Sequence, residues 1–174
     1  PELQTVQNLG IDGHVKLGSL LPPIPYPRRM WAGGELVISE LFQVNDNVKK
    51  TSVVTDIQHK TGSSGPLFFL TVTHNFFVQD KKMLSEKQHL VFKENNQNIF
   101  LQKGTTSKKT EQVKLPKSAI KKAIYDTDPV LLFRYSALTF NGHRIHYDID
   151  HAKKVEGQQG LVVHGPLQAT WLLN

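Results

Sequence analysis

LFFLTVTHNFFV at residues 67–78 and MLSEKQHLVFKE at residues 83–94 are the stretches that decide the fold of this protein. The first is rich in β-branched and aromatic residues, which favour an extended strand. The second alternates apolar and polar residues, as a strand with one buried face does. QDKK at residues 79–82 lies between them and predicts a tight turn. Together these stretches predict an antiparallel pair of long strands.

The sequence before this pair extends the same pattern. GGELVISELFQV at residues 33–44 and NVKKTSVVTDIQHK at residues 47–60 predict two further strands, and GSSGP at residues 62–66 predicts a turn. Residues 31–94 are therefore expected to form an antiparallel β-meander, one face of which needs a cover.

Residues 1–30 are expected to form an extended, proline-rich arm. GSLLPPIPYPRR at residues 18–29 carries four prolines, which interrupt any helix or central strand. The apolar residues of this arm are expected to pack on a surface; they are Leu20, Leu21, Ile24 and Met30. The alternative is an exposed polyproline ligand for a recognition domain.

The rest of the chain divides at a polar, lysine-rich connector, residues 95–125, whose lysines are either solvated or available to phosphates. Residues 126–174 are expected to start a second structural unit. HAKKVEG at residues 151–157 predicts a short helix that ends at Gly157. A second helix is expected to start at Gly165-Pro166, with its continuation beyond Asn174.

Composition limits the classes of function. The 174 residues suffice for one domain with a real core, and 21 Lys and Arg against 15 Asp and Glu give a net charge of +6. That balance favours an anionic partner, either nucleic acid, a phosphorylated cofactor or an acidic carrier protein; a functionally silent basic surface is the alternative. No apolar run approaches about 18 residues, so no spanning helix is expected. The absence of cysteine excludes disulfides and thiolate chemistry.

Chemistry concentrates in NGHRIHYD, residues 141–148. A neutral imidazole at His146 can exchange a proton near pH 7, and the amide of Asn141 can hold a water or a carbonyl oxygen. VVHGPL at residues 162–167 adds the backbone N–H groups of a helix start at Gly165, which suit an oxyanion hole for a thioester or ester carbonyl.

Two alternatives compete with this catalytic interpretation. A histidine in a turn is often only a hydrogen-bonded structural residue. The histidines at 143, 146, 151 and 164 also offer imidazoles for zinc or iron. The spacing of His143 and His146 lacks the i, i+4 helical presentation of metalloproteases, and the phosphate-binding loop of nucleotide hydrolases is missing.

Residues 131–173, which contain both of these motifs, strongly resemble the MaoC-like hydratases and dehydratases of the hot-dog fold. The resemblance is to the branch that contains mesaconyl-CoA hydratases and mitochondrial 3-hydroxyacyl-thioester dehydratases type 2. LPPIPYPRRMWAGGEL at residues 21–36 resembles the segment before the first meander in that branch. The resemblance implies an α+β hot-dog fold, an antiparallel sheet wrapped around a central helix, as part of a double hot-dog. It also implies that the central helix of the first unit precedes Pro1 and that further strands follow Asn174.

The family motif Ser-Gly-Asp-x-Asn-Pro-x-His, aligned on its histidine, implies the site residues. His146 falls on the catalytic histidine, Asn141 on the aspartate and His143 on the asparagine, while Gly165 falls on the glycine whose N–H polarises the thioester carbonyl. Asn141 has no titratable carboxylate, so Asp148, or less favourably Asp150, is the candidate replacement. Substrate contacts are expected from the neighbouring polar and small residues, namely His143, Arg144, Tyr147, His164 and Gly160.

The resemblance implies hydration of a trans-2-enoyl thioester, or dehydration of an (R)-3-hydroxyacyl thioester, in fatty-acid metabolism. The substrate would be an acyl-CoA or acyl-carrier-protein thioester, with no metal and no other cofactor. A homo-oligomer is expected, in the mitochondrial matrix of a eukaryote or otherwise in the cytoplasm. The rival functions are a hot-dog acyl-CoA thioesterase and a non-catalytic acyl-thioester binding module. Nucleic acid is not an expected partner, because few aromatic residues accompany the lysine-rich connector.

Overall fold

Four antiparallel strands and several short helices make up the part of the chain that the computed structural model describes, residues 4–18, 20–62, 65–94 and 124–173. They fall into two units. The strand unit contains residues 5–10 and 15–94, and the helical unit contains residue 4, residues 11–14 and residues 124–173. The lysine-rich connector predicted at residues 95–125 lies outside the described residues, apart from its last two.

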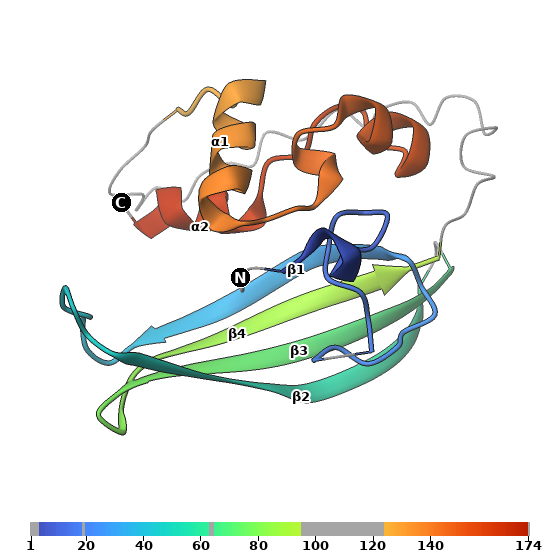
Figure 1. Ribbon diagram of the computed structural model, residues 1–174. Coiled ribbons are helices and arrows are strands. Elements are labelled where there is room, and N and C mark those ends of the chain that lie inside the picture. Colours follow the sequence, from blue (N-terminus) through green and yellow to red (C-terminus); the bar gives the residue numbers. More distant parts are fainter. Residues whose placement is uncertain (1–3, 19, 63–64, 95–123, 174) are drawn as a thin grey trace, which may run out of the picture. The chain divides into compact units, whose positions relative to one another are not determined.

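The strand unit is a single sheet with the strand order β1-β4-β3-β2, every pair antiparallel (Figure 1). The four strands are β1 (Arg28–Ile38), β2 (Val48–Gly62), β3 (Gly65–Val78) and β4 (Lys81–Lys93). A short 3-10 helix, η1 (Val6–Asn8), precedes them. Strands β2, β3 and β4 follow one another as the predicted meander does, with β3 and β4 as the central pair. The prediction was wrong for β1, which pairs with β4 and not with the next strand along the chain.

The turn predicted at residues 79–82 is confirmed, whereas residues 63–64 of the turn predicted at residues 62–66 lie outside the described residues. Gln79 and Asp80 join β3 to β4 with φ angles of 47° and 64°, the left-handed pair of a two-residue turn whose twist matches that of the strands. Gly65, with a φ of 102°, follows the turn between β2 and β3. Asp80 and Gly65 are of residue types that tolerate a positive φ angle, whereas Gln79 is not.

The first strand differs from its prediction, and the bounds 33–44 were wrong at both ends. β1 pairs with β4 alone, and β4 begins at Lys81. The amides of Ser39 and Glu40 both donate to the carbonyl oxygen of Met83, at 2.8 and 3.2 Å. Regular pairing therefore stops at Ile38, because two donors share one acceptor near the start of the partner strand.

One face of the sheet carries the core of the strand unit, formed by Ile24, Leu70, Val72 and Phe92. Ile24 belongs to the proline-rich segment, so this segment contributes to the core. Leu20 does not pack as expected and is 49% exposed. It lies in a turn in which the N–H of Gly18 donates to the carbonyl of Leu21, and this turn leaves its side chain toward solvent.

The helical unit contains α1 (Pro129–Thr139), η3 (Arg144–His146), η4 (His151–Val155) and α2 (Gly165–Leu173). The helices expected near residue 151 and from Gly165 are confirmed, the former as a π-helical turn with Gly157 at a φ of 69°. Helix α1 was missed, although Asp128 caps it and Pro129 starts it. No helix in the described part of the chain is long and apolar enough to cross a membrane.

Candidate active site

The end of α1 sets the direction of the histidine-rich turn. Phe140 adopts a left-handed φ of 51°, and its N–H and that of Asn141 donate to the carbonyls of Ala137 and Ser136. This pair of bonds is the Schellman motif, which ends a helix and reverses the chain. The side chain of Asn141 then accepts from the N–H of His143 at 3.1 Å, so Asn141 Oδ1 shapes the turn.

His146 lies at the centre of the candidate site, only 7% exposed. Its Nδ1 lies 2.7 Å from the carbonyl oxygen of Val162, which can only accept. Nδ1 therefore carries the proton, and Nε2 is left with a lone pair. Burial lowers the pKa of His146 to about 4, although the Val162 carbonyl favours the charged form. At pH 7 the ring is neutral, with its basic nitrogen directed away from Val162.

His164 stacks on His146, with ring centroids 3.7 Å apart and an interplanar angle of 20°. Its Nε2 lies 2.8 Å from the hydroxyl of Ser136 on α1, and its side chain is fully buried. His164 immediately precedes Gly165, the first residue of α2, so the stack joins the His146 ring to the residue before that helix. The structure thus brings together the two motifs that the sequence separated by a loop.

His143 is buried against a carboxylate. Its Nε2 lies 3.0 Å from Oε1 of Glu156, and both side chains are 4% exposed. The Nε2 of His151 lies 3.6 Å from the same oxygen. Glu156 was missed by the sequence analysis, because it stands before Gly157 at a helix end, where acidic residues are usually solvated. A buried carboxylate between two imidazoles is the main charged group of this site.

Asp148 has a clear structural role. Its Oδ2 accepts from Nε and Nη2 of Arg144 at 3.0 and 2.6 Å, and its Oδ1 accepts from the N–H of His151. The backbone bond from His151, followed by that from Arg144, lowers the pKa of Asp148. Asp148 is thus a carboxylate with both oxygens engaged. Asp150, the other candidate, is 72% exposed and pairs with Lys154.

The remaining predicted residues lie on the same turns. Tyr147 is 41% exposed, and its hydroxyl donates to the carbonyl of Gly142 at 2.8 Å. Burial is the main cause that raises the pKa of Tyr147. Gly160 borders open space, since a methyl group added there would meet no atom within 4 Å. These two residues therefore offer surface beside the buried histidines.

A segment that the sequence analysis did not single out joins this site. Residues 11–14 of the helical unit lie along the histidine-rich turn, where the carbonyl of Asp12 accepts from the N–H of Arg144 at 2.9 Å. The rings of His14 and His143 lie 4.1 Å apart. The signal was present in the sequence as Asp-Gly-His, a turn that carries an imidazole, but nothing in it pointed to a distant partner.

The close packing of residues 11–14 on the histidine-rich turn depends on two glycines, Gly13 and Gly142. A Cβ on Gly13 would lie 1.8 Å from the carbonyl oxygen of Gly142, and Gly13 has a φ of 86°. We expect Gly13→Ala to lower the free energy of unfolding by about 2 kcal/mol or more, because positive-φ strain and a backbone clash add. Gly18→Ala is the matched control, since Gly18 has a φ of 101° but open space around it. Equal losses in urea unfolding would show that the close approach does not matter.

The four histidines of the metal alternative do not form a ligand set. In the part of the chain that the structure describes, no three of them bring ligand atoms within 4.8 Å of one another. Their nitrogens instead have separate partners, the Val162 carbonyl for His146, Ser136 for His164 and Glu156 for His143.

Protonation of His164 is expected to weaken the fold in acid. Burial, followed by the charges of His146 and His143, lowers the pKa of His164 to about 4, whereas an unfolded histidine titrates near 6.5. The unfolded chain therefore binds the extra proton first, and stability that is complete above about pH 6.5 falls as the pH drops through about 4. The groups that face its ring are Ser136, Tyr135 and His146.

The measurement is the urea midpoint of unfolding between about pH 4 and 7, for the wild type and for His164→Gln. The glutamine keeps a hydrogen-bonding group for Ser136 but does not titrate, so its midpoint should fall less steeply in acid. Parallel curves for the two proteins would contradict the assignment.

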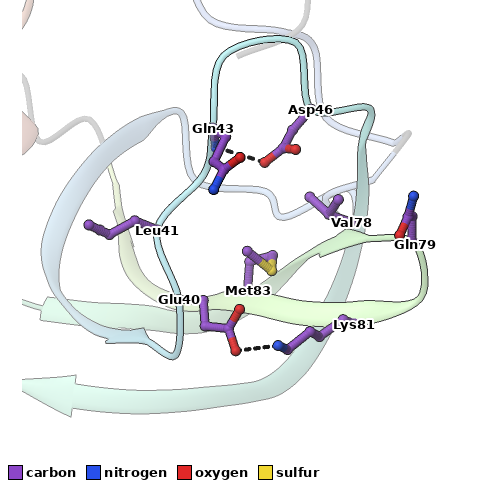
Figure 2. A pocket seen from close by; sticks show the side chains of 8 residues that line it. All are labelled: Glu40, Leu41, Gln43, Asp46, Val78, Gln79, Lys81 and Met83. Atoms are coloured by element: carbon purple, nitrogen blue, oxygen red, sulfur yellow. Dashed lines mark hydrogen bonds and ion pairs between the residues drawn. The ribbon is translucent and has the colours of Figure 1, made fainter.

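The strand unit contains a separate, open hollow of about 330 Å³ at the end of the sheet (Figure 2). It is lined by Glu40, Leu41, Gln43, Asp46, Val78, Gln79, Lys81 and Met83. Its polar groups are satisfied locally, since Glu40 pairs with Lys81 and Asp46 accepts from the N–H of Gln43 (Figure 2). It contains no imidazole, so the histidine-rich turn remains the candidate active site.

Two solved structures share the fold of the chain. HtdX of Mycobacterium tuberculosis matches with a TM-score of 0.61 and 16% identity, over 87% of this chain and 57% of that one. A protein described as a MaoC-like dehydratase matches with a TM-score of 0.60 and 15% identity, over 84% of this chain and 53% of that one. These likenesses agree with the α+β hot-dog fold that the resemblance implied.

Two curated proteins are related in sequence. Mesaconyl-C(4)-CoA hydratase of Chloroflexus aurantiacus is 41% identical over 95% of this chain and 56% of its own length. The mitochondrial hydroxyacyl-thioester dehydratase type 2 of Schizosaccharomyces pombe is 28% identical over 95% of this chain and 60% of its own length. The chain thus spans somewhat over half the length of these relatives. The profile of the hydroxyacyl-thioester dehydratase type 2 family matches residues 1–174, so the chain belongs to this family.

Proposed function

We propose that the protein adds water to a trans-2-enoyl thioester and, in reverse, dehydrates an (R)-3-hydroxyacyl thioester. The observation that carries this proposal is the stack of the neutral imidazole of His146 on His164, the residue that precedes the helix-start Gly165. One group can exchange protons, and the other can polarise a carbonyl. Membership of the family and the relatedness to a CoA hydratase support the same chemistry.

In the hydration direction, Nε2 of His146 takes a proton from water while the water oxygen bonds to C3 of the substrate. The C2=C3 electron pair moves toward the thioester carbonyl, whose oxygen accepts from the N–H of Gly165. The imidazolium of His146 then returns the proton to C2, so water is added across the double bond and the enzyme is regenerated. The N–H of Gly165 suits this role because the first amides of a helix have no intrahelical acceptor.

Asn141 is proposed to orient the water. Its Oδ1 is engaged by the N–H of His143, which leaves the two donors of its amide nitrogen for an oxygen atom. Asp148, held by Arg144 and His151, would act on the arrangement of the turn, and no proton transfer is assigned to it. These two roles follow from the hydrogen-bonding atoms of each side chain, since Asn141 keeps two donors for an oxygen atom and both oxygens of Asp148 are engaged.

Substrate contacts are proposed at the residues that surround this pair of groups. Tyr147 and Gly160 offer exposed or open surface, and Arg144 is a cation for a phosphorylated carrier. His143 and His164 are buried and would act by packing and orientation. The net charge of +6 is compatible with an anionic acyl-CoA or acyl-carrier-protein substrate.

The wider setting is part of the same proposal. We propose a role in fatty-acid metabolism, a double hot-dog architecture and a homo-oligomer, with a mitochondrial location if the protein is eukaryotic. The mitochondrial relative supports the location, and the greater length of the two structures of similar fold is compatible with a second hot-dog unit.

The test is to add crotonyl-CoA to the full-length protein and follow the enoyl-thioester absorbance beside a free-thiol assay. Loss of absorbance without thiol release, with (R)-3-hydroxybutyryl-CoA as product, is the expected result. Release of thiol would replace the proposal by a thioesterase. If a panel of acyl-CoA and acyl-carrier-protein thioesters binds but none reacts, the protein is an acyl-thioester binding module.

A further inference from the structure

Asp12, His14 and His143 form a cluster in which only His143 has a part in the proposed function, by packing and orientation, and no step of the proposed reaction uses any of the three. Each of the three side chains places one potential ligand atom within 4.8 Å of the other two. His143 is buried, whereas the side chains of Asp12 and His14 are 21% and 24% exposed. The cluster thus combines two imidazoles with one carboxylate, near the surface of the helical unit.

The separations suit a small cation. Three atoms that lie no more than 4.8 Å apart are within about 2.8 Å of a common centre, whereas zinc bonds to nitrogen and oxygen are about 2.0–2.2 Å long. Nδ1 of His14 and Oδ2 of Asp12 are already 2.9 Å apart. Two ligands in a tetrahedral zinc site stand about 3.3 Å apart, so an ion could replace the proton between them after small shifts.

The surroundings of His143 are those of a metal-binding histidine. Its Nε2 is held by the buried carboxylate of Glu156 at 3.0 Å, which leaves Nδ1 as the nitrogen for the cluster. A histidine ligand commonly gives its second ring nitrogen to a carboxylate, which fixes the ring and raises its basicity. Hydrogen bonds hold the two segments together, since the backbone N–H of Arg144 donates to the carbonyl of Asp12 and its Nη1 donates to the carbonyl of Ile11.

We propose that Asp12, His14 and His143 bind a divalent ion of the zinc class. Two imidazoles and one carboxylate are a donor set that suits Zn²⁺ and Co²⁺ and does not suit Mg²⁺ or Ca²⁺, which prefer oxygen. The partial exposure of Asp12 and His14 leaves room for a water as fourth ligand. The bound ion fastens residues 11–14 to the histidine-rich turn. This site is independent of the proposed hydratase reaction.

The experiment titrates the metal-free full-length protein with Zn²⁺ in a calorimeter and with Co²⁺ in a spectrophotometer. We expect one ion per chain at this site, with the visible absorption of Co²⁺ bound by nitrogen ligands, and no binding of Mg²⁺. His14→Ala should weaken binding of Zn²⁺ at least tenfold. His59→Ala is the matched control, because His59 is an exposed imidazole on β2 and should bind as the wild type does.

Asp12→Asn is a second variant that tests the site even if His14→Ala fails to fold. Its amide retains hydrogen-bonding capacity toward His14 but lacks the charge that a cation needs, so it should fold and still bind Zn²⁺ at least tenfold more weakly. Zn²⁺ should also raise the Tm of the wild type and of His59→Ala more than that of Asp12→Asn. The proposal is overturned if the wild type binds no Zn²⁺, or if folded Asp12→Asn binds it as tightly. Neither readout depends on hydratase activity.

Discussion

His146→Ala is expected to lower the kcat of enoyl-thioester hydration by about 10²- to 10⁴-fold, the usual contribution of a general acid or base. The ring is neutral at pH 7, and the Val162 carbonyl holds the proton on Nδ1, so Nε2 is the only basic nitrogen available. Alanine removes this nitrogen and leaves the helix-start amide of Gly165 in place. The loss should therefore fall mainly on kcat, measured with saturating crotonyl-CoA.

Three further variants test whether the loss of kcat is specific to His146. His59→Ala removes an exposed imidazole from β2 and should leave turnover unchanged. Asp148→Asn should lower the free energy of unfolding and change kcat little, because this carboxylate holds Arg144 and the start of η4. Asn141→Asp tests whether a carboxylate at the position of the family aspartate can share the proton transfer. Normal turnover in His146→Ala would show that the assignment is wrong.

Glu156→Ala is expected to lower the free energy of unfolding by about 3–5 kcal/mol, the range for removing one partner of a buried ion pair. Glu156 and His143 are both 4% exposed and lie 3.0 Å apart, and His151 approaches the same carboxylate. Alanine leaves the buried imidazole of His143 without its acceptor and opens a cavity. Urea unfolding monitored by circular dichroism measures the loss.

Two control variants test whether the loss of stability depends on the side chain of Glu156 and on its burial. Glu156→Gln preserves shape and an acceptor oxygen, so it should cost less than alanine. Glu35→Ala removes an exposed carboxylate that pairs with Lys87 on the sheet, where water screens the pair, so its removal should change stability little. A loss below about 1 kcal/mol in Glu156→Ala would mean that the histidines find other partners or water.

Local sequence determined the strand unit to a large degree. β3 and β4 follow from their residue types, and the turn between them is indicated by Asp80, which tolerates a positive φ angle. The end of β1 did not follow, since Ser39 and Glu40 have strand-like neighbours on both sides. Their pairing depended on where the partner strand begins, which is a property of the sheet and not of the segment.

The sequence by itself determined the consecutive strands β2, β3 and β4, the start of α2 at Gly165 and the presence of a histidine-rich turn after residue 140, but not the pairing of β1 with β4. Only the tertiary structure decided which groups meet there. Glu156 reaches His143 across a π-helical turn, and Asp12 and His14 reach it from more than a hundred residues away along the chain. The close approach of Gly13 to Gly142 could not be predicted from the sequence either. Strand and turn preferences act between neighbouring residues, whereas these contacts arise when separate segments pack, so no local pattern encodes them.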